Sequence, residues 1–261
     1  MKDITKEVLN SKKYFAIDEE VIKFISKEEA IKFKKQSDVV KSVKNKLHQV
    51  HEVFLPADDL KSLSKCDAEA LLRLHVSTRE RLGFYQEFLK EVFDSAAKVL
   101  NKDFIESCID IGAGFNGVAL CEYGYFKNRI NSYKAFDINR EATQALNKFF
   151  ELEGCQNAVA ITQGIFDEDL KIDAEVCLML KLLPVLISQC SGKTQDILDR
   201  IFSKINSKVV IVSFPIKSLS GRDVGMAENY EKNIIAKLPK NWQAKDKLCF
   251  ENEIVYIIEN I

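Results

Sequence analysis

The chain has 261 residues, of which 46% are hydrophobic and 30% charged, and its formal net charge at pH 7 is −1. This composition excludes a disordered or fibrous protein, and the length suffices for one large domain and a smaller one. The seven cysteines are scattered without a C-x-x-C pair, and the amino terminus, MKDITKEVLN, lacks the apolar core of a signal peptide. We therefore expect reduced thiols and a cytoplasmic protein with no membrane partner.

Residues 1–101 carry a helical pattern. Apolar side chains recur at spacings of three and four, for example at Val39, Val40 and Val43. Asp18 and Asp67 stand where helix N-caps are expected, and residues 82–100 predict a long amphipathic helix. Between Lys23 and Lys46, eight lysines stand against three acids. This excess predicts either a solvated helix surface or a basic face for nucleic acid.

From residue 102 onward, strand patterns alternate with helical ones. A short apolar run that ends in glycines, CIDIGAG, is followed at once by a helical stretch, NGVALCEYG. Further strands are predicted at residues 132–138, 157–165, 175–180 and 208–214. This alternation predicts a parallel sheet with helices on both faces. The tail, KDKLCFENEIVYII, instead predicts an antiparallel pair joined by a short turn at residues 251–253.

A glycine-rich turn lies between the first predicted strand and its helix. Gly112, Gly114 and Gly117 form the pattern G-x-G-x-x-G, which lets the backbone approach a ligand closely. Asp137 ends the next predicted strand, where its carboxylate can accept hydrogen bonds from both hydroxyls of an adenosine ribose. NAD and S-adenosylmethionine both fit this pattern, as does a turn without a ligand. The acidic residue Asp110, which lies just before the glycine turn, and the closing antiparallel strand pair favour a methyltransferase over a dehydrogenase.

Three segments carry a closer likeness: HVSTRERL at residues 75–82, KLLPVL at 181–186 and SFPIKSLSGRDVGMAENY at 213–230. Shorter matches, KKYFAID at 12–18 and KLHQV at 46–50, extend it toward the amino terminus. Together they resemble the aminoglycoside-resistance methyltransferases that modify a guanine N7 in 16S ribosomal RNA. The resemblance covers nearly the whole chain. It implies an α/β fold: a Rossmann-like class I methyltransferase domain at residues 102–261, with a seven-stranded, mostly parallel sheet, behind a helical 30S-docking domain at residues 1–101.

The same resemblance implies the site for S-adenosyl-L-methionine. Its cofactor-binding set comprises His75, Ser77, Arg81, Gly112, Gly114, Asp137, Ile138, Gln163, Gly164 and Leu182. In this set Arg81 pairs with the carboxylate of the methionine end, a geometry that suits a guanidinium. Asp137 holds the ribose, and Gln163 with Gly164 flanks the adenine.

The resemblance also implies contacts to RNA. The residues expected beside the target are Lys217, Arg222, Met226 and Glu228, and Lys34 and Lys35 are expected to contact phosphates together with Lys32, Lys41, Lys44 and Lys46. We expect no catalytic general base, because guanine N7 already carries an in-plane lone pair. We also expect no metal, no DNA partner and a monomeric protein.

The implied reaction is methylation of a guanine in the decoding A site, in helix 44 of the 30S subunit, which confers aminoglycoside resistance. In that family the glycine motif continues into Asn-Pro. This chain departs from the motif, because its Asn116 is followed by Gly117. Three alternatives stay open. They are a methyltransferase for another RNA or a small molecule, a catalytically idle ribosome-binding protein, and an NAD-dependent oxidoreductase.

Overall fold

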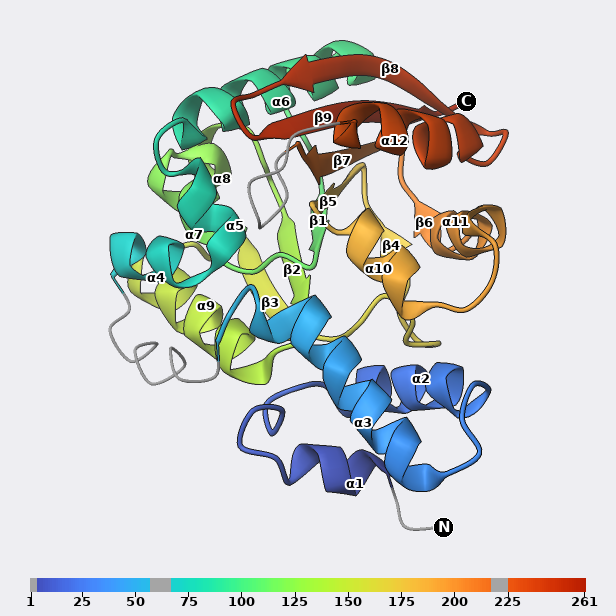
Figure 1. Cartoon of the computed structure of the whole chain (residues 1–261). Helices are drawn as coiled ribbons and strands as arrows, with labels where there is room; N and C mark the ends of the chain where they lie inside the picture. Colours follow the sequence, from blue (N-terminus) through green and yellow to red (C-terminus); the bar gives the residue numbers. More distant parts are fainter. Residues whose placement is uncertain (1–3, 57–66, 217–224) are drawn as a thin grey trace.

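A seven-stranded sheet forms the centre of the molecule (Figure 1). The structure, a computed structural model, describes residues 4–56, 67–216 and 225–261. The strand order is β3-β2-β1-β5-β7-β9-β8, built from β1 (Cys108–Ile111), β2 (Tyr133–Asp137), β3 (Ala158–Thr162), β5 (Val176–Leu180), β7 (Val209–Pro215), β8 (Trp242–Cys249) and β9 (Glu253–Asn260). Strands β3, β2, β1, β5 and β7 are parallel, whereas β9 runs antiparallel to both β7 and β8. The predicted α/β class with a mostly parallel sheet is therefore confirmed.

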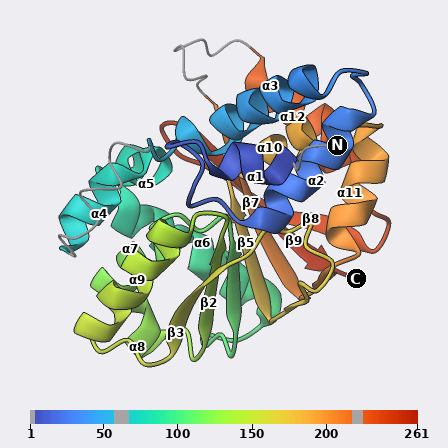
Figure 2. The ribbon, with the colours of Figure 1, turned by 90° about the horizontal axis from the view of Figure 1, so that it is seen from below.

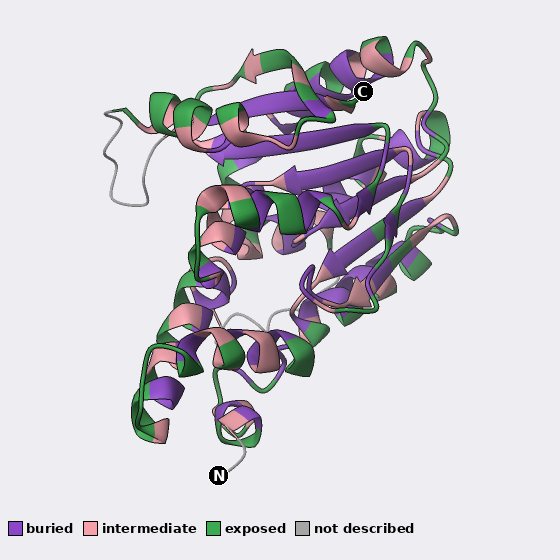
Figure 3. Ribbon diagram, turned by 90° about the vertical axis from the view of Figure 1, so that its right-hand side faces the viewer, coloured by how far each residue is buried: buried purple, intermediate pink, exposed green. Residues whose placement is uncertain are grey.

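The central strands of the sheet are buried on both faces, as their apolar sequences predict (Figure 3). Because successive side chains of a strand point to opposite faces, Val209 and Ile211 join one core cluster while Val210 and Val212 join the other. Helices α6 (Tyr85–Leu100), α7 (Asn116–Glu122), α8 (Tyr125–Asn128) and α9 (Arg140–Leu152) cover the first face. The second face is covered mainly by α10 (Leu183–Gln189) and α11 (Thr194–Phe202), with α12 (Met226–Asn233) and the 3₁₀ turn η3 (Ile235–Lys237) beside them. A small two-stranded sheet pairs β4 (Ile172–Asp173) with β6 (Ile205–Asn206).

An amino-terminal lobe is formed by α1 (Ile4–Leu9), α2 (Glu19–Ala30) and α3 (Gln36–Leu47), and a π-helical turn at His48–Glu52 leads out of it (Figures 1 and 3). The lobe has a buried cluster of its own, with Ile22, Val43 and Leu47 at its centre. Asp18 caps α2 as predicted, because its side chain accepts a hydrogen bond from the Glu20 amide.

The lobe is joined to the sheet directly behind β2. The Asp18 amide donates to the Ile138 carbonyl at 2.8 Å, and the Arg140 amide donates to the Ala16 carbonyl at the same distance. Figure 2 shows α2 beside α11, where the Arg200 guanidinium lies 3.9 Å from the Glu28 carboxylate. The amino-terminal lobe is thereby positioned next to Asp137.

Helices α4 (Ala68–Leu74) and α5 (Val76–Arg81) follow, and Asp67 caps α4 as predicted. Helices α4 and α6 bury their apolar side chains in the same cluster as the sheet, whereas α1–α3 do not, and α5 contributes the buried Arg81, which pairs with Glu253 of β9. By packing, residues 67–100 thus belong with the sheet. The division into domains at residues 101 and 102 stays a prediction.

Each strand predicted at residues 132–138, 157–165, 175–180 and 208–214 is present, with ends that differ from the prediction by up to three residues. The difference is largest at β3, where residues 163–165 leave the strand and line a cavity. At the carboxyl end, Glu253 belongs to β9 and not to the turn, because it pairs with Pro215 in the sheet. No helix in the described ranges has the length and apolar character needed to cross a membrane. Every cysteine that the structure describes is free, and Cys66 lies outside those residues.

Candidate cofactor and substrate site

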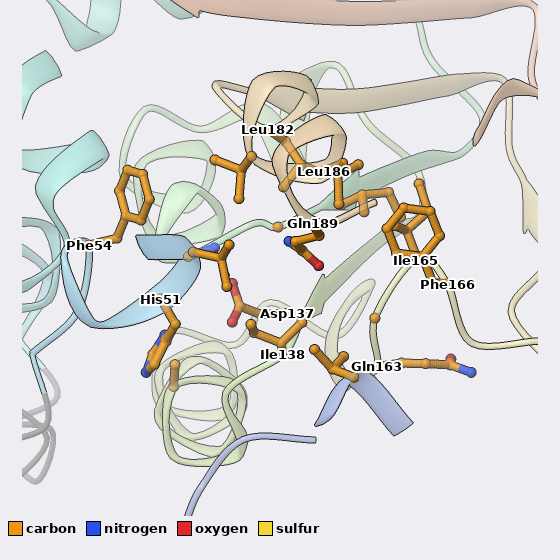
Figure 4. A pocket seen from close by; sticks show the side chains of 18 of the residues that line it. His51, Phe54, Asp137, Ile138, Gln163, Ile165, Phe166, Leu182, Leu186 and Gln189 are labelled. Carbon is orange, nitrogen blue, oxygen red and sulfur yellow. Dashed lines mark hydrogen bonds between the residues drawn. The ribbon is translucent and has the colours of Figure 1, made fainter. Parts of the chain in front are cut away.

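A cavity that is open to solvent lies at the carboxyl ends of the central strands (Figure 4). This edge is where doubly wound sheets bind their ligands. The lining includes nine of the ten residues predicted to bind the cofactor, namely His75, Ser77, Gly112, Gly114, Asp137, Ile138, Gln163, Gly164 and Leu182. The predicted cofactor residues are therefore gathered around one space, although their contacts with a ligand stay predictions.

Asp137 lies in the centre of the cavity lining (Figure 4). Its Oδ2 accepts a hydrogen bond from the Gly114 amide and its Oδ1 from the Asn139 amide, each at 3.0 Å. Gly112 and Gly114 adopt φ values of 65° and 50°, which glycine permits without steric cost. Burial raises the pKa of the Asp137 carboxyl, while these backbone donors oppose the rise. The arrangement holds a carboxylate in place as an acceptor for hydroxyl groups.

A buried network lies beneath the glycine turn. Asp110 accepts hydrogen bonds from Asn116 Nδ2 at 2.7 Å and from the Tyr133 hydroxyl at 2.9 Å. The Tyr85 hydroxyl in turn donates to Asn116 Oδ1 at 2.7 Å. Burial raises the pKa of Asp110 to about 6, and the donors moderate that rise. Asp110 does not line the cavity and therefore supports the turn from below.

The surroundings of Gly117 explain why glycine stands where the family motif has proline. A Cβ added at this position would lie 2.8 Å from Phe150 Cζ and 3.1 Å from Tyr133 Cε1. The Phe150 and Tyr133 rings meet edge to face, with centroids 6.2 Å apart. The aromatic core of this chain thus fills the space that a side chain at residue 117 would need.

One wall of the cavity is apolar and has an amide at its end. The side chains of Ile138, Ile165, Phe166, Leu182 and Leu186 line it, and Figure 4 shows the Gln189 amide pointing into the same space. Such a slot suits a flat heterocycle such as adenine. The side chain of Gln163, by contrast, donates to Asp167 Oδ2 at 2.9 Å and points away from Asp137 (Figure 4). Any adenine contact of Gln163 must therefore come from its backbone.

His75 and Ser77 lie together at the other end of the cavity. His75 Nδ1 and Ser77 Oγ are 2.8 Å apart, and a Cβ at Gly114 would lie 3.0 Å from the imidazole. Enclosure by the protein lowers the pKa of His75 to about 3, with nearby cationic groups adding to the effect. The imidazole is therefore neutral at physiological pH.

Arg81 is the one member of the predicted cofactor set that does not line the cavity. Its Nε and Nη2 donate to the two carboxylate oxygens of Glu253 at 2.8 and 2.6 Å, and both side chains are buried. Burial opposes the charge on Arg81, but the adjacent Glu253 carboxylate raises its pKa overall. In this structure the partner of Arg81 is Glu253, so its pairing with a cofactor carboxylate stays a prediction.

Several other lining residues were not predicted, among them a buried lysine and side chains of the amino-terminal lobe. Lys181 lines the cavity from the end of β5, and its ammonium lies 2.6 Å from Glu80 Oε2. The amino-terminal lobe adds Glu20, Val21 and Phe24 from α2, and the π-helical turn adds His51. These contacts join segments far apart in sequence. The only local signal was the position of Lys181 within KLLPVL.

Of the residues predicted beside the RNA, Lys217 and Arg222 lie outside the described residues. Met226 and Glu228 begin α12, where Met226 is half-buried and Glu228 exposed, and neither lines the cavity. Lys34 and Lys35 are exposed just before α3. Of the other lysines, Lys32 pairs with Glu29, and Lys46 donates to the Ser188 carbonyl. Their contacts with RNA stay predictions.

The similarity to known proteins extends over nearly the whole chain. The family described as ribosomal RNA methyltransferase (FmrO) matches residues 10–257. A 16S rRNA (guanine(1405)-N(7))-methyltransferase of Serratia marcescens is 27% identical over 99% of this chain and 98% of its own length. An enzyme of the same name from Micromonospora rosea is also 27% identical, over 85% and 82% respectively. The crystal structure of the 16S rRNA methyltransferase RmtF with S-adenosyl-L-homocysteine is 25% identical, with a TM-score of 0.82, over 99% of this chain and 97% of that one.

The strand order, the closing antiparallel pair and the cavity together define a class I methyltransferase. This chain belongs to the ribosomal RNA methyltransferase (FmrO) family. The predicted family and enzyme class are thus confirmed. The predicted cofactor, S-adenosyl-L-methionine, agrees with the ligand of the RmtF structure.

Proposed function

We propose that this protein transfers a methyl group from S-adenosyl-L-methionine to N7 of a guanine in the decoding A site of 16S ribosomal RNA. The target lies in helix 44 of the assembled 30S subunit, and the modification confers aminoglycoside resistance. The observation that carries the proposal is the near full-length similarity to two enzymes named for this guanine N7 reaction. The gathered cavity residues support it, because their side chains and backbone turn suit an adenosyl ligand.

The residues present fit the cofactor. Asp137, with both oxygens oriented by backbone amides, accepts hydrogen bonds from the ribose hydroxyls. Ile138 and Leu182 enclose the adenine, and His75 with Ser77 faces the methionine end. When bound, S-adenosyl-L-methionine supplies an activated methyl group on a sulfonium.

The main task of the protein in this reaction is to align the reacting groups. Guanine N7 attacks through its own lone pair, so no side chain needs to remove a proton first. His75 is neutral and linked to Ser77, which suits it to lining the site and not to proton transfer. Holding the base, the methyl group and the departing sulfur in line is a problem of proximity and orientation.

The amino-terminal lobe is the proposed docking element for the 30S subunit. Its exposed lysines, Lys34 and Lys35 among them, contact phosphates without reading sequence. Because the same lobe lines the cofactor cavity, docking brings the RNA to the methyl donor. We propose that the protein acts as a cytoplasmic monomer on this partner.

Drug resistance tests the proposal in cells. Expression in an aminoglycoside-sensitive bacterium should raise the inhibitory concentration of drugs that bind the decoding site, because the added methyl group removes the N7 acceptor. Asp137→Ala should abolish the effect at equal protein level, and Asp169→Asn, which changes an exposed loop carboxylate, should not. Unchanged sensitivity with the unmodified protein would contradict the proposal and favour another RNA, a small molecule or an idle ribosome-binding protein.

A further inference from the structure

Lys181 is held at the cavity in a conformation that is uncommon for a lysine. Its φ is 57°, in the left-handed region, and its amide donates to the Ser213 carbonyl at 3.1 Å and to Ser213 Oγ at 2.9 Å. Only 6% of its side chain is exposed, yet the residue lines the cavity. A strained, buried and charged residue at a ligand cavity is typical of a functional position.

The charges around Lys181 form two pairs of different character. Glu253 is completely buried and is engaged by two donors of Arg81, while its Oε2 lies 3.5 Å from Lys181 Nζ. Glu80 lies 2.6 Å from the same ammonium, but 37% of its side chain is exposed. The main chain of Glu80 is held by Asn252, whose Nδ2 donates to the Glu80 carbonyl at 3.2 Å. The buried pair therefore supports the site. The Lys181–Glu80 pair lies at the rim of the cavity, because Lys181 lines the cavity whereas Glu80 lies beyond the lining and is partly open to solvent.

This rim pair offers a donor beside an acceptor. An ammonium only donates hydrogen bonds, and an ionised carboxylate only accepts them. Guanine presents the complementary edge, with the O6 acceptor beside the N1–H and N2–H donors. Adenine presents an amino donor and a bare N1 acceptor in the corresponding places, so its donor would face the ammonium and its acceptor would face the carboxylate, which disfavours adenine.

We propose that the Lys181–Glu80 pair reads the target guanine, with Lys181 donating to O6 and Glu80 accepting from N1–H and N2–H. The inference rests on the proposed function, because it assigns residues to the base of that reaction. The group that the cavity rim receives is accordingly a guanine base turned out of its stack. Turning out the base costs a few kcal/mol, which these contacts help to offset.

Glu80 also stabilises the transition state. The N7 lone pair forms the new N–C bond while the C–S bond of the sulfonium breaks, and the positive charge passes from sulfur to the purine. No proton has to leave during this step. As the purine becomes cationic, its N1–H becomes a stronger donor, so its hydrogen bond to Glu80 strengthens between ground state and transition state. Only interactions that strengthen in this way raise kcat.

The test compares Glu80→Gln with Glu69→Gln, using purified protein, S-adenosyl-L-methionine and unmethylated bacterial 30S subunits. Glu69 is a matched control, because it also forms an ion pair at 2.6 Å, with Arg73 on the surface of α4. We expect Glu80→Gln to keep the Tm and the Kd for S-adenosyl-L-homocysteine while kcat falls about 10- to 100-fold, as for loss of a hydrogen bond to a charged group. Glu80→Asp should recover part of the lost kcat, and Glu69→Gln should match the unmodified protein.

Two results would overturn the inference. The first is an unchanged kcat in Glu80→Gln. The second is a fall in kcat together with weaker binding of S-adenosyl-L-homocysteine and a lower Tm, which would show that the ion pair only stabilises the fold. Failure of the proposed function is seen separately, since the unmodified protein would then leave the 30S guanine N7 unlabelled. Lys181→Met is a second variant, with the same expected loss of kcat at unchanged cofactor affinity.

Discussion

Phe24 of α2 stacks on Phe166, with ring centroids 4.2 Å apart and ring planes 17° from parallel. The Arg200 guanidinium lies over both rings, 5.0 Å from one centroid and 5.1 Å from the other. Since both rings line the cavity, this contact makes the amino-terminal lobe one of its walls. The lobe and the sheet domain are thereby connected at the expected adenine end.

Phe24→Ala should therefore weaken cofactor binding although Phe24 lies outside the sheet domain. Loss of the ring opens the wall and frees Phe166, and we expect the Kd for S-adenosyl-L-homocysteine to rise about 10-fold, in line with one aromatic contact. Isothermal titration calorimetry measures this change. Phe33→Ala, which removes an exposed ring just beyond α2, is the control and should leave the Kd unchanged. Equal affinities in all three proteins would show that the lobe is no part of the cofactor site.

Asp137→Asn tests the ribose acceptor. The amide keeps the shape of the side chain but loses the charge, and its NH₂ cannot accept from the Gly114 or Asn139 amide. We expect the affinity for S-adenosyl-L-homocysteine to fall about 10- to 100-fold, as for lost hydrogen bonds to a charged group. Calorimetry with Asp169→Asn as the charge-matched control checks this. Retained affinity in Asp137→Asn would remove the ribose role.

Gly117→Ala tests the explanation for the departure from the family motif. A methyl group at residue 117 would meet the Phe150 ring, so we expect a loss of about 1 to 3 kcal/mol in the free energy of unfolding, the range for overpacked cores. Urea unfolding measures it. In the background of Phe150→Leu the cost of Gly117→Ala should shrink, because the two positions are in contact. Strictly additive effects would contradict this account.

His51→Gln tests the effect of a buried histidine on stability. Burial lowers the pKa of His51 to about 4, and its Nε2 lies 3.0 Å from Asn139 Nδ2. Between pH 6.5 and 4 the unfolded chain therefore binds more protons at this residue than the folded one, so acid destabilises the fold through His51. Above pH 6.5 this effect is absent.

We accordingly expect the loss of unfolding free energy between pH 7 and pH 5 to be smaller in His51→Gln than in the unmodified protein, by up to about 2 kcal/mol. Asp110 is unchanged in both proteins, so its own titration cancels in the comparison, whereas the pKa of His75 is lowered in part by His51 and loses that contribution in His51→Gln. His48→Gln, on the exposed side of the same turn, should behave like the unmodified protein. Identical pH dependence in all three would contradict the role of burial at His51.

The sequence predicted local features better than distant contacts. The strand at Val209–Pro215 begins with four consecutive apolar residues, and Asp18 and Asp67 mark helix starts through side-chain chemistry that acts within three residues. Asp137 was predictable because it ends the first strand after the glycine turn. Such signals act over a few residues, so they survive without knowledge of the tertiary fold.

The contacts that sequence reasoning missed depend on packing. Glu253 meets Arg81 across 172 positions of sequence, and Phe24 meets Phe166 only because the amino-terminal lobe is joined behind β2. Gln163 was predicted as an adenine neighbour, but the side chain is engaged by Asp167 and points away from the cavity centre. Position along the chain locates a residue near a site, whereas packing decides which way its side chain points.

The most direct measurement is transfer of labelled methyl from S-adenosyl-L-methionine to purified, unmethylated bacterial 30S subunits, followed by strand cleavage at N7-methylguanine. We expect the unmodified protein to label one guanine, in the decoding A site of helix 44, and the control variant Asp137→Ala to be inactive. Labelling at another base would keep the methyltransferase and contradict the target. No labelling by a protein that still binds S-adenosyl-L-homocysteine would contradict the proposed reaction on the 30S subunit.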